Sequence, residues 1–163
     1  MEIREDLVPF LMSGVSLLVG TRDAELVPAC ARAMGVRIAS DRRSFTVYLP
    51  AATADRTLAN VRDNGRIAVT FSRVLDLRGV QMKGHVTSVR EAPLADRDFQ
   101  ARYFDAFLAA LEEVGMPRGT SQRMAFWPSV AIDVTPDVIF EQTPGPVAGR
   151  PLPEGATMDG PRP

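Results

Sequence analysis

The sequence predicts a mostly β domain, an antiparallel barrel or sheet with about three helices outside it. Several apolar, β-branched segments are separated by turn residues, as in VSLLVGTRD and FTVYLP. Two longer stretches change to helical spacing. The chain has 163 residues, 45% hydrophobic and 24% charged, which suits one domain that buries a core without disulfides or metals.

The N-terminal third predicts a short helix followed by a meander of three strands. A helix over residues 2–12, ended near Ser13 and Gly14, is indicated by four apolar residues on one face: Ile3, Leu7, Phe10 and Leu11. VSLLVGTRD predicts a strand over 15–23. Residues 25–39 alternate small and larger side chains, which indicates one long bent strand. The turn DRRS then leads into FTVYLP, residues 45–50.

The middle of the chain predicts a helix between two strands. Leu58 and Val61 are three residues apart, Thr53 can cap, and DNG supplies a stop, so we expect a helix over 53–63. RIAVTFS, residues 66–72, returns to strand. The segment LRGVQMKGHVTSV starts a further strand that runs to about Arg90.

The last part predicts the clearest helix, two short strands and a tail. The helix covers 96–114, ends at Gly115, and has apolar residues at helical spacing: Phe99, Tyr103, Phe107, Leu111 and Val114. We assign the stripe of Phe99, Tyr103 and Phe107 to the core. SVAIDVTPDVIFEQ predicts a pair of short strands around Thr135 and Pro136. From Gln142 the chain is rich in Pro and Gly, so residues 1–141 form the domain and 142–163 a disordered tail or an arm on a partner subunit.

Charge and composition exclude several classes of function. With 19 basic and 20 acidic residues, no global field draws the chain to nucleic acid or anionic lipid. One cysteine and one histidine cannot build a structural zinc site, and Cys30, with no basic neighbour in sequence, is expected to be a buried inert thiol. The acidic start is unlike a signal peptide, and no run approaches the ~20 apolar residues of a membrane span, so we expect a cytoplasmic protein.

Polar residues crowd the first half of the strand that begins near Leu77. Alternation places Arg78, Val80, Met82 and Gly84 on one face and Gly79, Gln81, Lys83 and His85 on the other. The simplest explanation is a strand whose polar face meets water. A strand glycine, however, often marks a bulge or a close ligand, which favours a binding face.

A second group of residues has the features of a phosphate site. In LPAATADRTLANVRDNGR a strand ends, small residues follow, and the predicted helix begins with Thr53 as cap and Arg56 in its first turn. Free amide N–H groups, the positive helix end and a guanidinium would then converge. A capped surface helix with an exposed arginine explains the same residues equally well.

The order of these parts resembles the pyridoxamine 5'-phosphate oxidase-like family, the FMN-binding split barrels. The resemblance covers about residues 15–146: a meander, FTVYLP, a helix with an arginine, RIAVTFS, and a strand beginning RGVQMKG, where the family commonly carries R-x-x-Q-x-K-G. The resemblance implies a split β-barrel, a homodimer, and a flavin mononucleotide cleft at the dimer interface.

The resemblance also assigns residues. Arg56 matches the helix position that meets the phosphate, with Thr53 beside it, and Arg37 matches a basic phosphate-binding residue on the second long strand. Arg78, Gln81 and Lys83 match the motif strand. The ring or ribityl chain would be bordered by Leu49, Pro50, Ala51 and Ala52, and Trp127 would stack on a flavin of the other subunit or pack across the dimer interface.

The chain also departs from the family pattern. The substrate-binding Arg/His pattern near the end of the true oxidases has no counterpart, so oxidation of vitamin B6 is not expected. Gly79 stands where those oxidases usually have a flavin-contacting glutamine. No P-loop, G-x-G-x-x-G fingerprint or Ser/His/acid triad is present.

We therefore expect an FMN-dependent oxidoreductase that acts on a small molecule, with no metal and with the flavin supplying the redox chemistry. The alternative is a split barrel without turnover that carries flavin or haem, or has an empty cleft. His85 is the one candidate imidazole base or haem ligand in the sequence, although a lone histidine on a strand is more often a hydrogen-bonded polar side chain.

Overall fold

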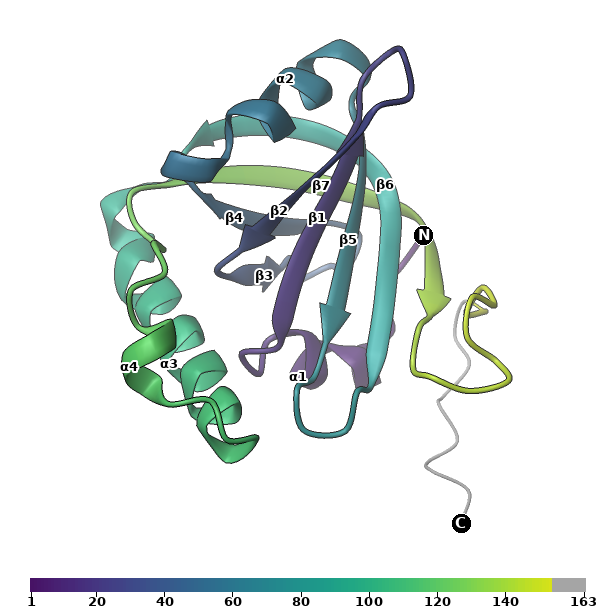
Figure 1. Ribbon diagram of the computed structural model, residues 1–163. Coiled ribbons are helices and arrows are strands. Elements are labelled where there is room, and N and C mark those ends of the chain that lie inside the picture. The colour runs from purple at the N-terminus through teal and green to yellow at the C-terminus, as the bar shows by residue number, and fades with distance from the viewer. Residues whose placement is uncertain (154–163) are drawn as a thin grey trace.

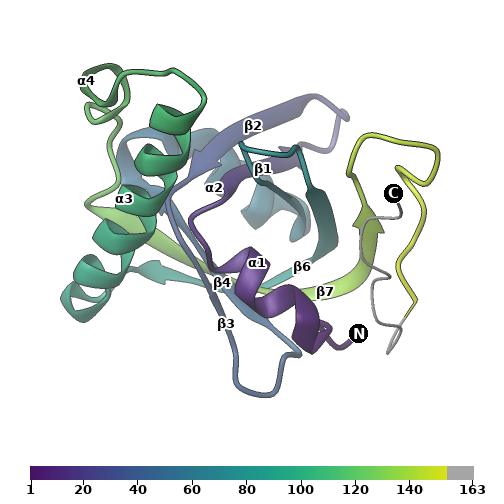
Figure 2. The same ribbon diagram turned by 90° about the horizontal axis from the view of Figure 1, so that it is seen from below.

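The computed structural model describes residues 1–153, in which seven antiparallel strands form one sheet that curls into a barrel (Figures 1 and 2). The order across the sheet is β2-β1-β5-β6-β7-β4-β3. The strands are β1 (Ser16–Arg22), β2 (Pro28–Ala33), β3 (Val36–Ile38), β4 (Phe45–Pro50), β5 (Arg66–Ser72), β6 (Gly79–Glu91) and β7 (Ser129–Glu141). The predicted fold class is confirmed.

The barrel closes because one segment contributes to both edges of the sheet. β2 pairs with β1 and β3 pairs with β4, and only Met34 and Gly35 lie between β2 and β3. At this bend Met34 N donates to Tyr48 O at 2.8 Å, and Tyr48 N donates to Gly35 O at 3.0 Å. The single bent strand predicted over 25–39 is therefore two strands. At the bend between them, the chain leaves the sheet edge beside β1 and joins the edge beside β4.

The longest strands, β6 and β7, pair along most of their length with two register shifts. At the first shift Lys83 faces Val138 and Gly84 faces Pro136, so Asp137 is an extra residue in β7. The prediction of two short strands around Thr135 and Pro136 was wrong. Proline lacks a backbone donor, but here it lies at a bulge, where one strand can continue through it.

Helices cover the ends and one side of the barrel. The predicted first helix is shorter than expected, a 3-10 turn at Glu5–Leu7 followed by α1 (Val8–Leu11). α2 (Asp55–Asn64) covers one end of the barrel, and α3 (Arg97–Glu113) runs along its side with the short α4 (Arg118–Ser121), which was not predicted (Figure 1). Two further 3-10 turns lie at Ala51–Thr53 and Leu94–Asp96.

The start of α2 differs from the prediction. Its N-cap residue is Ala54, without a side-chain cap, and Thr53 lies in the preceding 3-10 turn, where its hydroxyl donates to Pro50 O at 3.4 Å. The capping role given to Thr53 was therefore wrong. The C-terminal end of α2 is as expected, since Gly65 adopts a left-handed φ of 66° and its N–H donates to Val61 O.

The core fills the barrel interior with the inward-facing residues of the strands, among them Leu17, Val69 and Met82. The predicted α3 stripe packs as expected: Tyr103 and Phe107 are buried and Phe99 is partly buried. The Tyr103 hydroxyl lies 3.2 Å from Leu11 O and 3.0 Å from Val15 O, and so ties α3 to the N-terminal segment.

The first part of the expected tail lies along the chain's own strand β7. Leu152 N donates to Ile139 O at 2.7 Å and Gly149 N to Glu141 O at 2.7 Å, beyond the part of β7 that pairs with β4. Residues 142–153 thus cover an otherwise open edge of β7, and residues 154–163 lie outside the described part of the chain. Within residues 1–153, no helix is both long and apolar enough to cross a membrane.

Candidate functional site

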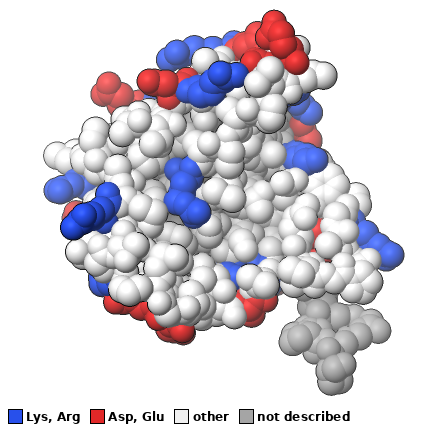
Figure 3. Space-filling model, in the orientation of Figure 1, with Lys and Arg blue, Asp and Glu red and all other residues white. Residues whose placement is uncertain are grey.

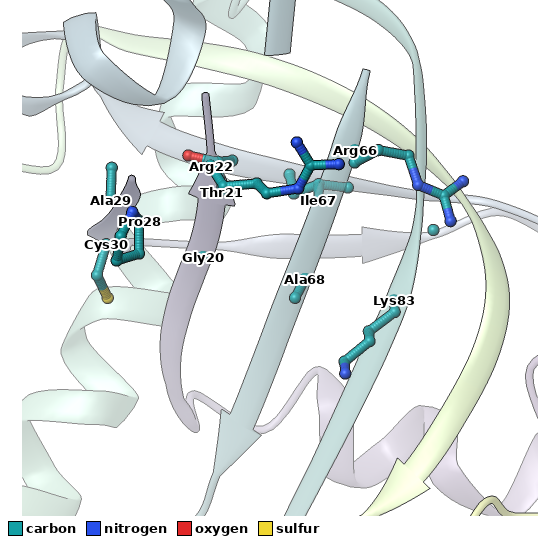
Figure 4. A pocket seen from close by; sticks show the side chains of 11 residues that line it. Gly20, Thr21, Arg22, Pro28, Ala29, Cys30, Arg66, Ile67, Ala68 and Lys83 are labelled. Carbon is teal, nitrogen blue, oxygen red and sulfur yellow. The ribbon is translucent and has the colours of Figure 1, made fainter. Parts of the chain in front are cut away.

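An open groove of about 570 Å³ lies on the outer face of the sheet, across β2, β1, β5 and β6 (Figure 4). No helix covers these strands in Figure 1. The lining residues are Gly20, Thr21, Arg22, Pro28, Ala29, Cys30, Arg66, Ile67, Ala68, Lys83 and Gly84. The volume lies within the usual range for small-molecule sites, roughly 300–1,000 Å³.

The groove exists because its floor has almost no side chains. Gly20 pairs with Ala68 on one side and with Cys30 on the other. A Cβ on Gly20 would meet only Ala68 O, at 3.9 Å, so the space above the glycine is open. Three neighbouring strands therefore present a flat, shallow floor, which suits a planar ligand.

The rim of the groove is basic. Figure 4 shows Arg22, Arg66 and Lys83 around the floor, from β1, β5 and β6. Lys83 has its ammonium 4.9 Å from the centre of the Phe140 ring, whereas Arg66 is paired with Asp137 at 3.1 Å. In Figure 3 this face is mostly uncharged with separate basic side chains, and the acidic residues gather near the two ends. Such a rim favours an anionic ligand.

Gln81 and Lys83 are the predicted site residues that the structure brings to this face. Alternation along β6 is as expected, with Lys83 exposed and Val80 and Met82 buried in the core. Gln81 is half-buried, and its amide donates to Thr70 Oγ1 on β5 at 2.9 Å. Among residues 1–153, no hydrogen bond to its side-chain carbonyl oxygen is present, so this oxygen can accept one from a ligand.

Arg56 lies near the end of the groove that Arg22 lines, which is the upper end in Figure 4. Its guanidinium pairs with Asp23 Oδ2 at 3.2 Å and is 61% exposed. Asp23 follows Arg22, whose own guanidinium donates to Asp23 O at 3.0 Å. Arg56 and Arg22 therefore flank the same turn, and a phosphate there would compete with Asp23 for both.

The predicted residues at the end of β4 form a separate group. Leu49 and Pro50 are buried, while Ala51, Ala52 and Thr53 lie in the 3-10 turn before α2. Ala51 N donates to Pro128 O at 2.9 Å, which places Trp127 near this turn. None of these residues lines the groove.

Arg37 belongs to a third group, at the other edge of the sheet. Its guanidinium pairs with Asp96 at 3.0 Å and lies 4.5 Å from the centre of the Phe99 ring. Asp96 also accepts from the buried Tyr48 hydroxyl at 2.8 Å. Burial first, and this hydrogen bond second, raise the pKa of Tyr48 to about 12. The cluster ties α3 to β3 and β4.

Arg78 lies one residue before β6, near α1. Its guanidinium carbon lies 4.6 Å from the centre of the Phe10 ring, and its buried Nε has no partner among the described residues. The residues that the sequence grouped into one site therefore lie in four separate places in the structure. Three of them, Gln81, Lys83 and Arg56, lie beside the groove.

Sequence reasoning missed most of the groove lining. The prediction of a buried Cys30 was wrong, because the thiol is exposed over the floor. The missed residues Arg22 and Arg66 stand at strand ends in GTRD and NGRIA, where a sequence shows only polar turns. The small residues Gly20 and Ala68 could have indicated a groove, but that they lie side by side depends on the order of the strands, which the sequence does not show.

The residues present fit FMN chemically. Guanidinium and ammonium groups are the usual partners of a phosphate, and the floor would accept the flat ring. Gln81 does not line the groove, but it lies on the same face two residues before Lys83 and carries an amide that can bond a polar ligand. Among the described residues, no group of His, Cys, Asp and Glu could hold a metal ion.

Comparison with known proteins places the chain in a family. The family model described as pyridoxamine 5'-phosphate oxidase matches residues 3–142. A search of curated protein sequences found no match.

Solved structures with the same fold include HupZ of Group A Streptococcus, with 20% identity and a TM-score of 0.54 over 90% of this chain and 100% of that one. A second is named F420 reductase, with 15% identity and a TM-score of 0.54 over 84% and 98%. A third is a Clostridium acetobutylicum protein related to general stress protein 26, of the pyridoxinephosphate oxidase family, with 15% identity and a TM-score of 0.50 over 84% and 88%. At these identities the likeness concerns the fold.

Proposed function

The chain belongs to the pyridoxamine 5'-phosphate oxidase family, and on that premise we propose that it is an FMN-dependent oxidoreductase acting on a small organic molecule. The observation that carries the proposal is the groove, which combines a flat floor with a basic rim. When bound, the flavin would supply the redox chemistry. The protein would supply binding, orientation and the exclusion of water.

The residues of the groove divide into three roles under this proposal. Arg22 and the nearby Arg56 would neutralise the phosphate at the upper end, while Arg66, already paired with Asp137, would border the ring. Lys83 would stand beside the ring and stabilise negative charge that develops on it, because a cation in a partly desolvated groove acts more strongly than one in water. Gln81 would hold the edge of the ring by a hydrogen bond.

The same proposal includes a homodimer. An exposed face with a shallow groove leaves one side of a planar ligand in water, and a second subunit would cover it. Leu18, 38% exposed on β1, lies on this face. An apolar side chain beside an open groove favours a protein contact there.

Flavin retention tests the proposal. The purified chain is mixed with FMN, freed of unbound ligand, and its visible spectrum is recorded. We expect stoichiometric retention that falls at least ~10-fold for Lys83→Ala, as for a charge-assisted contact of ~1.4 kcal/mol. Arg43→Ala, an exposed arginine in the β3–β4 turn, is the matched control. Equal loss of flavin in both variants would contradict the assigned site.

A split barrel that carries flavin or haem without turnover is the second candidate. The related possibility of an empty cleft is supported by Gly79, which stands where the family's oxidases usually have a flavin-contacting glutamine and whose Cβ position lies 3.1 Å from Gln142 O. A retained flavin that no reductant or acceptor can cycle, or a haem band in its place, would favour this candidate over the enzyme.

A further inference from the structure

The chain's one histidine belongs to a cluster of charged groups beside the groove. His85 Nδ1 lies 3.2 Å from Asp137 Oδ1, and the other oxygen, Oδ2, accepts from Arg66 at 3.1 Å. His85 is 47% exposed at its side chain and Asp137 39%. One carboxylate thus holds an imidazole and a groove-lining guanidinium together.

The backbone is built to place this carboxylate. Asp137 is the extra residue of the β7 bulge and has no paired residue on β6. The bulge brings Thr135 O close to Gly84, where a Cβ would lie only 2.1 Å from that oxygen. A glycine is therefore required opposite the bulge, and the bulge turns Asp137 toward His85 and Arg66. Bulges commonly re-aim a side chain in this way next to active sites.

The geometry leaves one ring nitrogen of His85 available. An ionised carboxylate only accepts hydrogen bonds, so Nδ1 carries the hydrogen and donates it to Asp137. Nε2 is then the nitrogen without this partner. His85 is the cross-strand neighbour of Arg66 and the second residue after Lys83 on the same face, about 7 Å further along β6. It stands at the rim, next to the residues that line the groove.

We propose that His85 Nε2 gives a proton to, and takes one from, the molecule that exchanges electrons in the groove, with Asp137 as the residue that positions the ring. This inference rests on the proposed flavin function, and it assigns an acid–base residue, which that function had not yet included. The charged groups facing His85 are Asp137 from β7, Arg66 from β5 and Lys83 from β6.

The proton balance shows why such a group is needed. An acceptor such as a quinone gains two electrons and two protons when it becomes a hydroquinone. A hydride delivers two electrons and one proton, so one further proton must come from the protein or from water. His85 supplies that proton at Nε2 and recovers it from solvent. The substrate class is thus an acceptor that is protonated as it is reduced.

The first test uses the fact that the sequence contains a single histidine. Its ring C–H signals in an NMR spectrum are unambiguous, and FMN added to the protein should shift them with the same saturation curve as flavin retention. If FMN is retained and the histidine signals stay in place, the inference is wrong and the flavin function stands. If FMN is not retained, both fail.

The second test measures proton delivery directly. Protein loaded with FMN is reduced with dithionite, mixed with menadione, and followed by the return of flavin absorbance. We expect the rate to fall at least ~10-fold in His85→Gly and to recover when free imidazole is added, which a purely structural role would not allow. Asp137→Asn should lower the rate less, and without imidazole rescue.

Ser88→Ala, an exposed position three residues further along β6, is the control and should match the wild-type rate. A His85→Gly rate equal to that of Ser88→Ala would overturn the assignment of proton transfer. A slow His85→Gly that imidazole does not restore would also overturn it, because the defect would then lie in structure.

Discussion

At the scale of single residues, two glycines on neighbouring parts of the sheet lack a side chain for opposite reasons. Gly84 faces backbone, since its Cβ would lie 2.1 Å from Thr135 O, whereas Gly20 faces open space. We expect Gly84→Ala to lower the free energy of unfolding by roughly 1–3 kcal/mol through overpacking. Gly20→Ala should stay within about 0.5 kcal/mol of the wild type. Urea denaturation compares them, and equal stabilities would contradict the close approach at the bulge.

Gly20 has a second consequence, for binding. A larger side chain there would stand in the groove without disturbing the core beneath it. We expect Gly20→Val to keep the urea midpoint of the wild type and to raise the Kd for FMN at least ~10-fold, because the flat floor is lost. Fluorescence titration measures the Kd. Unchanged affinity in a folded Gly20→Val protein would place the flavin elsewhere.

Tyr48 makes stability depend on pH in the alkaline range. Burial and the hydrogen bond to Asp96 raise its pKa from 10.0 to about 12. The unfolded chain therefore loses the phenol proton first, so this contribution to stability is complete below about pH 10 and declines as pH rises toward 12. Burial also raises the pKa of Tyr103, so it contributes in the same direction. Tyr48→Phe should show a smaller loss of stability between pH 9 and 11 than the wild type in urea titrations. An identical loss would show that the phenol does not titrate with unfolding.

At the scale of elements, the segment after β7 protects an edge. Residues 149–152 form backbone hydrogen bonds with Ile139 and Glu141, where β7 extends beyond β4. A chain ending at Gln142 would lose them and expose the strand, so we expect its free energy of unfolding to fall by about 1–3 kcal/mol and its tendency to aggregate to rise. A chain ending at Pro153 is the control. Equal urea midpoints and equal light scattering for the two chains would argue against a protective role.

The elements also show how far the sequence could be interpreted. Periodicity located α3 and the strands of VSLLVGTRD, FTVYLP and RIAVTFS, because each is governed by local burial. The break at Met34 and Gly35 could not be seen, since hydrogen bonds from the distant Tyr48 create it. The continuity of β7 through Pro136 likewise depends on Gly84 of β6. On the groove face, the outward positions of Gln81 and Lys83 followed from alternation. Arg22 and Arg66, by contrast, become neighbours only through strand order.

At the scale of the whole molecule, the uncovered face of β1, β5 and β6 leads to the last prediction. Helices pack against other parts of the barrel (Figure 1). This face carries the groove and the exposed Leu18. If a second copy covers it, a charge at Leu18 would be buried without a partner on both subunits, which is strongly unfavourable. We therefore expect the wild type to sediment as a dimer and Leu18→Glu as a folded monomer that retains less FMN.

Leu94 provides the matched control for this prediction, because it is more exposed than Leu18, at 73%, but lies in the 3-10 turn before α3. Leu94→Glu should remain dimeric and keep its flavin. Analytical ultracentrifugation gives the mass of each variant, and urea titration confirms that each is folded. A monomeric wild type would remove the dimer from the proposed function, and a dimeric Leu18→Glu would move its interface to another face. Loss of flavin only together with loss of the dimer would show that the second subunit completes the site.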